Sequence, residues 1–214
     1  MFKLVTQWPP KCGDIGFDCA NGGITDLIVL GEIWGDAAVL GALKDSGYPI
    51  PHHAYTVTND GRAFESLNEG PTFTPINDYR QMWIDGQTWL MRPEGSDAAK
   101  VAAMALTIQK YDPRPYGWFK TLLGFLVVFP FRRILRRNVP NPFHLGIMCS
   151  ELAGYYLKAL HFFLRSYGET GASDQLWFAR YANASWDPAY LAALCLTNGV
   201  VSLAKPAPAQ AVHP

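Results

Sequence analysis

The feature that most constrains how this chain can fold is an amphipathic pattern that begins beside the cysteine at position 149. Apolar residues then recur at three- and four-residue steps, at Leu152, Ala153, Tyr156, Leu157, Leu160 and Leu164. This spacing predicts an α-helix with one buried face, which continues to about Ser166. Ser150 is a candidate N-cap, so we expect Cys149 at or just before the first helical turn.

A thiol at the start of a helix has a chemical consequence. Unpaired backbone N–H groups and the positive end of the helix dipole both favour the thiolate over the thiol. Cys149 is therefore a candidate nucleophile. The alternative is a buried cysteine that acts as a small apolar side chain.

The other three cysteines, Cys12, Cys19 and Cys195, have no candidate partners, and we expect them in the core. They form no CxxC pair, so the spacing indicates neither a zinc knuckle nor a dense disulfide framework. We therefore expect neither a metal site nor a cofactor.

Composition limits the function classes. The 214 residues suffice for one sizeable domain, and 49% of them are apolar against only 17% charged. Eighteen basic and eighteen acidic residues cancel, which gives no reason to expect a nucleic-acid partner. The N-terminus lacks the apolar core of a secretory signal peptide, so we expect a cytoplasmic or virion-associated protein.

The clearest β-hairpin in the sequence spans residues 52–67. Residues 52–58 are rich in β-forming side chains, Asn59-Asp60-Gly61 is typical of a turn, and residues 62–67 are predicted to form the returning strand.

The length of that turn decides which histidine lies beside Glu65. A three-residue loop places His53, Tyr55 and Glu65 on one face of the hairpin, because side chains alternate along a strand. A two-residue loop reverses the parity and places His52 there instead. Gly61 suits the left-handed third position of a three-residue loop, so His53 is the preferred partner and His52 its rival.

The remaining pattern predicts further strands and helices in an α+β arrangement. We expect strands at 72–76 and 88–92, a helical turn at 77–83, helices at 24–43, 97–110, 150–166 and 188–196, and a loop at 168–173. Residues 1–203 are expected to form a single domain, and the Ala/Pro-rich residues 204–214 a flexible tail.

An apolar segment with four arginines at its end covers about residues 118–137. Its apolar run is too short to span a bilayer, which takes about 20 residues. Three uses stay open: a core helix, a docking hairpin for a protein partner, or an interfacial segment on a membrane surface.

Several short motifs occur in an informative order. Gly13-Asp14-Ile15 opens a strand, His53 and Glu65 lie on the hairpin, Arg114-Pro115-Tyr116 forms a turn, and Cys149-Ser150-Glu151 opens the long helix. This order resembles the circularly permuted papain-fold group of NlpC-type cysteine hydrolases, typified by the bacterial YiiX and YaeF proteins. The resemblance spans roughly residues 11–200.

The resemblance implies a permuted papain-like fold, in which a small antiparallel sheet packs against the helix that bears the nucleophile. Cys149 would attack a carbonyl carbon, His53 would act as the base, and Glu65 would orient the imidazole. Tyr116 and Ser150 are candidates for the oxyanion site or the pocket wall. The implied activity is hydrolysis of an amide or peptide bond, in the wider family a cell-wall peptide, through a thioester acyl-enzyme.

His144 is a second rival base, five residues before Cys149. If that run is a strand, odd spacing places the two side chains on opposite faces, so His144 ranks below His53.

Two alternative functions remain. A lipid acyltransferase or esterase of the same fold, as among the relatives of lecithin retinol acyltransferase, is favoured by the apolar segment at 118–137. A non-catalytic structural or interaction protein, for example a component of a phage particle, agrees with the 14% aromatic content.

Overall fold

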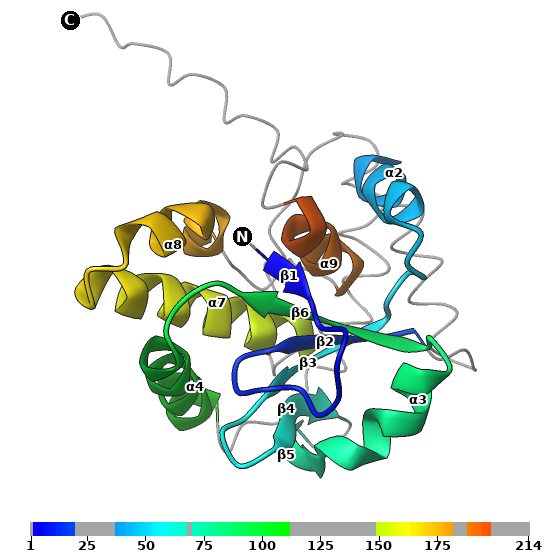
Figure 1. The fold of residues 1–214 in the computed structure, drawn as a ribbon, viewed down its shortest axis with the longest axis horizontal. Coiled ribbons are helices and arrows are strands. Elements are labelled where there is room, and N and C mark those ends of the chain that lie inside the picture. Colours follow the sequence, from blue (N-terminus) through cyan, green and yellow to red (C-terminus); the bar gives the residue numbers. More distant parts are fainter. Residues whose placement is uncertain (1, 20–36, 68–69, 112–148, 182–187, 198–214) are drawn as a thin grey trace, which may run out of the picture.

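A six-stranded antiparallel sheet organises the computed structural model of the protein, which describes residues 2–19, 37–67, 70–111, 149–181 and 188–197 (Figure 1). The strand order is β1-β6-β2-β3-β4-β5. The strands are β1 (Phe2–Leu4), β2 (Ile15–Asp18), β3 (His53–Val57), β4 (Arg62–Leu67), β5 (Gly70–Pro75) and β6 (Thr88–Pro93). Every paired neighbour is antiparallel. The expected α+β class is confirmed.

The hairpin of β3 and β4 has the register of the three-residue loop. Thr56 pairs with Phe64, and the Thr58 N–H donates to the Arg62 carbonyl oxygen at 2.8 Å. Gly61 has a φ of 76°, the left-handed conformation that glycine adopts without steric cost. His53, Tyr55 and Glu65 therefore lie on one face of the sheet.

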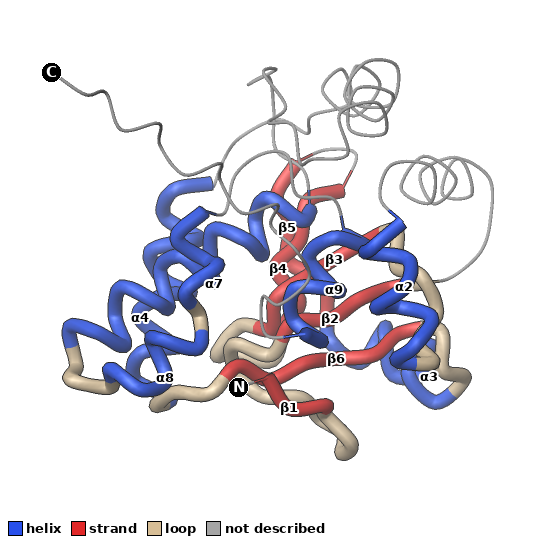
Figure 2. The backbone as a smooth tube through the Cα atoms, turned by 90° about the horizontal axis from the view of Figure 1, so that it is seen from above, coloured by secondary structure: helices blue, strands red, loops and turns tan. Residues whose placement is uncertain are grey.

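The amphipathic pattern forms α7 (Cys149–Ser166). All six residues of the predicted stripe are buried. This face of α7 packs against β3, β4 and the helix α4 (Asp97–Tyr111). Figure 2 shows α4, α7 and the short helix α8 (Thr170–Gln175) together on one side of the strands, with α3 (Arg80–Ile84) at the opposite end of the molecule.

The sheet buries apolar side chains on both faces. On the α7 face, Ala54 and Phe64 join a large core with residues of α4, α7 and α9 (Pro188–Thr197). On the other face, Tyr55 and Leu90 belong to a smaller core with Tyr79, the last residue of the 3-10 helix η1 (Ile76–Tyr79). Two cores on two faces explain why the four central strands, β6, β2, β3 and β4, are buried along most of their length, unlike the edge strands β1 and β5.

A glycine on β2 makes room for an aromatic ring on β3. Gly16 pairs with Tyr55 in the register, and the Tyr55 ring lies directly over it. The ring crosses β2 and brings the Tyr55 hydroxyl to within 3.4 Å of Thr88 Oγ1 on β6. A Cβ at position 16 would fall 2.0–2.5 Å from three ring atoms, so only glycine fits there.

Some expectations need correction or lie outside the described residues. Residues 168–173 were expected to be a loop, but α8 begins at Thr170, because Ser173 is buried and hydrogen-bonded to His161 of α7. The helix expected at 24–43 is described only from Ala37, as α2 (Ala37–Ser46). The apolar segment 118–137 and the tail 204–214 fall outside the described ranges. Among the helices that the structure does describe, none has the length and apolarity needed to cross a membrane.

Candidate active site

A histidine and a glutamate meet on the face of the β3–β4 hairpin that lies away from α7. His53 is the first residue of β3, and Glu65 lies on β4. His53 Nε2 and Glu65 Oε2 are 2.6 Å apart, within hydrogen-bond distance. The Glu65 side chain is completely buried and the His53 side chain is 13% exposed, so water screens this pair weakly. The preference for His53 over His52 as the partner of Glu65 is confirmed.

Cys149 reaches the same histidine from the first position of α7. Cys149 is 5% exposed, and its thiol interacts with the His53 imidazole by a hydrogen bond and by charge. Because Nε2 of His53 is bonded to Glu65, Nδ1 is the ring nitrogen left for Cys149. The imidazole therefore stands between the thiol and the carboxylate, as thiol catalysis requires.

The contacts around this pair favour its charged form. Burial opposes a thiolate, but His53 and the backbone N–H groups of Ala54 and Ser150 outweigh it and lower the pKa of Cys149. Burial likewise opposes an imidazolium, yet Cys149 and Glu65 together raise the pKa of His53 well above its usual value. Both shifts favour a thiolate–imidazolium pair at neutral pH.

Glu65 has a second hydrogen-bond partner that the sequence analysis missed. The Tyr79 hydroxyl donates to Glu65 Oε2 at 2.6 Å, on the same oxygen that faces His53. Burial raises the pKa of Glu65, but the hydrogen bond and charge of His53, with smaller contributions from hydrogen bonds of Thr74 and Tyr79, more than offset it, so the carboxyl pKa is lowered overall. The only sequence signal at Tyr79 was the helical turn predicted around it.

The remaining candidates are placed as follows. Ser150 is the second residue of α7 and is buried, so it is not the N-cap that we expected; the helix begins one residue earlier, at Cys149. The His52 N–H donates to the Asp18 carbonyl oxygen at 3.0 Å. Tyr116 and His144 lie outside the described residues.

The Gly13-Asp14-Ile15 motif has a structural role. Asp14 is completely buried, and Arg92 of β6 donates to both its carboxylate oxygens at 2.7 Å. The Lys11 N–H adds a further hydrogen bond to Asp14 at 2.8 Å. These bonds hold the loop before β2 against β6.

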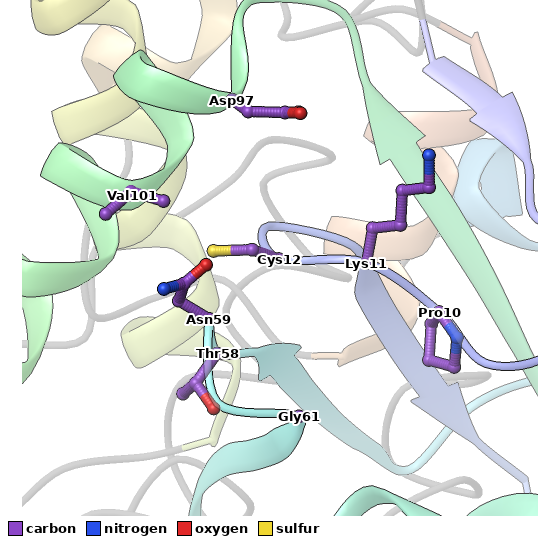
Figure 3. Close-up of a pocket in the computed structure, with 8 residues that line it drawn as sticks. All are labelled: Pro10, Lys11, Cys12, Thr58, Asn59, Gly61, Asp97 and Val101. Atoms are coloured by element: carbon purple, nitrogen blue, oxygen red, sulfur yellow. The ribbon is translucent and has the colours of Figure 1, made fainter.

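Cys12 was expected in the core, but it is partly exposed and lines a cavity of about 260 Å³ (Figure 3). The cavity lies at the Thr58 end of β3, whereas His53 is at the other end. Burial and the nearby carboxylates of Asp97 and Asp14 raise the pKa of Cys12 to about 11. Cys12 is therefore a neutral thiol at physiological pH, and its pKa is shifted in the opposite direction to that of Cys149.

Within the described part of the chain, no group of three or more His, Cys, Asp or Glu side chains is arranged to hold a metal ion. A comparison with protein-family models, with curated proteins and with solved structures finds no match for this chain.

Proposed function

We propose that this protein is a thiol-dependent hydrolase that cleaves an amide or peptide bond through a thioester acyl-enzyme. One observation carries the proposal: a single imidazole, that of His53, interacts with the Cys149 thiol and, through its other side, with the buried Glu65 carboxylate. The order of the short sequence motifs, which resembles that of permuted papain-fold hydrolases of the NlpC type, supports the same reaction class.

The first half of the reaction forms the thioester. The Cys149 thiolate attacks the substrate carbonyl carbon, a C–S bond forms, and the negative charge moves to the carbonyl oxygen. The Cys149 backbone N–H has no acceptor within its own helix, because it lies in the first turn, and it is a candidate donor to that oxygen. When the C–N bond breaks, the His53 imidazolium gives its proton to the leaving amine.

The second half restores the enzyme. Neutral His53 takes a proton from water, whose oxygen attacks the thioester carbon. The C–S bond then breaks, the acid product leaves, and the thiolate–imidazolium pair forms again. Glu65 is not consumed in either half; it fixes the tautomer of His53, because its carboxylate accepts a hydrogen bond from Nε2–H throughout.

A thiol-labelling experiment tests the proposal without a known substrate. The full chain is treated briefly with iodoacetamide across a pH series, and the labelled cysteines are identified by peptide mapping. Cys149 should label at mildly acidic pH ahead of Cys12 and Cys195, because burial raises the pKa of both of those thiols. It should also label ahead of Cys19, whose thiol donates to the Pro49 carbonyl oxygen at 3.4 Å.

Two variants make this experiment specific. His53→Ala should slow Cys149 labelling about tenfold or more at mildly acidic pH, because the imidazolium that stabilises the thiolate is lost. His52→Ala is the matched control and should label as the wild type does. Equal labelling of Cys149 and Cys12, with no effect of His53→Ala, would refute the proposal and favour a non-catalytic role.

Acyl transfer to the thiol is tested separately with an activated ester. Nitrophenyl acetate should give a burst of nitrophenol, with the acetyl group on Cys149 by mass spectrometry. Cys149→Ala should remove the burst, since it removes the nucleophile. A burst that survives in this variant would assign the acylation to another residue.

A further inference from the structure

The Tyr79 hydroxyl is joined to the candidate site by a hydrogen bond to Glu65. It donates to Glu65 Oε2 at 2.6 Å, and His53 Nε2 approaches the same oxygen at 2.6 Å. Two hydrogen bonds that end on one oxygen fix that oxygen from two directions. The position of the carboxylate, and with it the angle of the His53 ring, therefore depends on Tyr79 as well as on the strand.

Tyr79 is suited to act as a permanent donor. It is 8% exposed, and burial together with the neighbouring Glu65 carboxylate raises its pKa far above the physiological range. The phenol therefore stays protonated wherever the protein is folded. Because a protonated phenol next to a carboxylate can only donate to it, the polarity of this hydrogen bond does not change with pH.

The ring of Tyr79 is held in turn by Tyr55. The two rings stack with centroids 4.3 Å apart and an interplanar angle of 27°. Tyr55 is itself confined between Gly16 below its ring and Thr88 beyond its hydroxyl. Tyr79 thus has a rigid support, and this support does not itself include a hydrogen bond to Glu65.

We propose that Tyr79 is a positioning residue for the thiol chemistry: its hydroxyl holds the Glu65 carboxylate so that His53 presents Nδ1 to Cys149. This inference rests on the proposed function, since it gives Tyr79 its role through Glu65 and His53. Tyr79 does not touch the reacting atoms. Its alternative role is purely structural, as an aromatic member of the smaller core, and the two roles predict different results for loss of the hydroxyl.

The test compares two tyrosine-to-phenylalanine variants in the full chain. Tyr79→Phe keeps the ring and the stack but removes the donor to Glu65. Tyr55→Phe is the matched control, because it removes a buried hydroxyl from the same stack, and that hydroxyl is hydrogen-bonded to Thr88 and not to Glu65. Cys149 alkylation is measured against pH at a temperature where thermal melting shows every variant to be folded.

Tyr79→Phe should slow alkylation at mildly acidic pH on the order of tenfold and shift the midpoint of the pH profile upward, because a misplaced imidazole stabilises the thiolate less well. Tyr55→Phe should leave the profile unchanged. In a Glu65→Gln background, Tyr79→Phe should have little further effect, because residues that act through one partner are not additive.

The outcomes separate this inference from the proposed function. If wild-type Cys149 shows no preferential labelling, the proposed function fails. If wild-type Cys149 labels preferentially but Tyr79→Phe matches it, only the role of Tyr79 is overturned. Equal effects of Tyr79→Phe and Tyr55→Phe would also overturn it, because they would show that general packing sets the profile.

Discussion

Replacing Gly16 by alanine should destabilise the protein strongly, although the change adds only one methyl group. A Cβ at this position would lie 2.0 Å from Cζ of Tyr55 and 2.3 and 2.5 Å from its two Cε atoms. Carbon atoms in contact normally stay about 3.5–4.0 Å apart, so the ring must move by about 1.5 Å or the strands must separate. Neither movement is free, because Tyr55 is completely buried and stacked on Tyr79.

The cost follows from these two constraints. Overpacking of a filled core costs about 1–3 kcal/mol, and loss of good aromatic stacking adds about 0.5–1.5 kcal/mol. We therefore expect Gly16→Ala to lower the free energy of unfolding by about 2–4 kcal/mol. For a chain of this size, that corresponds to a melting temperature roughly 5–15 °C lower.

The assay is urea unfolding followed by circular dichroism, with Gly41→Ala as the control. Gly41 lies inside α2 with nothing within 4 Å of the added Cβ, so alanine should stabilise the protein there by about 0.5–1 kcal/mol. Tyr55→Leu should partly relieve Gly16→Ala, because it removes the atoms that clash. If Gly16→Ala lies within about 0.5 kcal/mol of wild type, or if the two changes are additive, the packing argument is wrong.

Two further predictions concern buried charges. Arg92→Ala should lower the free energy of unfolding in urea by about 2–3 kcal/mol, because it leaves the buried Asp14 carboxylate without a charged partner. The loss stays below the upper range for fully buried pairs, because Arg92 is about one-third exposed. A loss under about 0.5 kcal/mol would contradict the structural role of this pair. Glu65 has a lowered pKa in the folded state, so its contribution to stability is present above the unfolded-state pKa of about 4.3 and is lost as pH falls through the folded-state value. Wild type should therefore be more stable than Glu65→Gln at pH 7, and the difference should shrink below about pH 4 in thermal melts; a constant difference would argue against an ionised Glu65.

Local signals in the sequence were sufficient for the elements that carry the three candidate residues. The stripe of α7 was predicted from its period, because each of its apolar positions faces the same core. The hairpin register was predicted from Gly61, because a left-handed residue at that place selects a three-residue loop. Strand alternation then paired His53 with Glu65.

Long-range contacts carried no such signal. Tyr79 reaches Glu65 from a 3-10 helix whose position depends on the path of β5, so nothing in the local pattern indicates that contact. Asp14 and Arg92 are 78 positions apart and meet only because β6 pairs with β2. The helix α8 escaped prediction for a similar reason: its polar, glycine-containing sequence favours a loop, and packing against α7 overrides that preference.

The location of the candidate site at the end of β3 makes it depend on strand register more than on any single contact. Cys149 comes from the helix on one face of the sheet, while Glu65 and Tyr79 lie on the other, so only a residue at the first position of β3 meets both. A slip of one residue would bring His52 beside Glu65 and turn the His53 imidazole to the opposite face of the sheet. Two glycines oppose that slip. Gly61 sets the loop length at one end of the hairpin, and Gly16 leaves the room on β2 that the ring of Tyr55 needs in this register. Gly61 and Gly16 thus determine that His53, and not His52, lies beside Cys149.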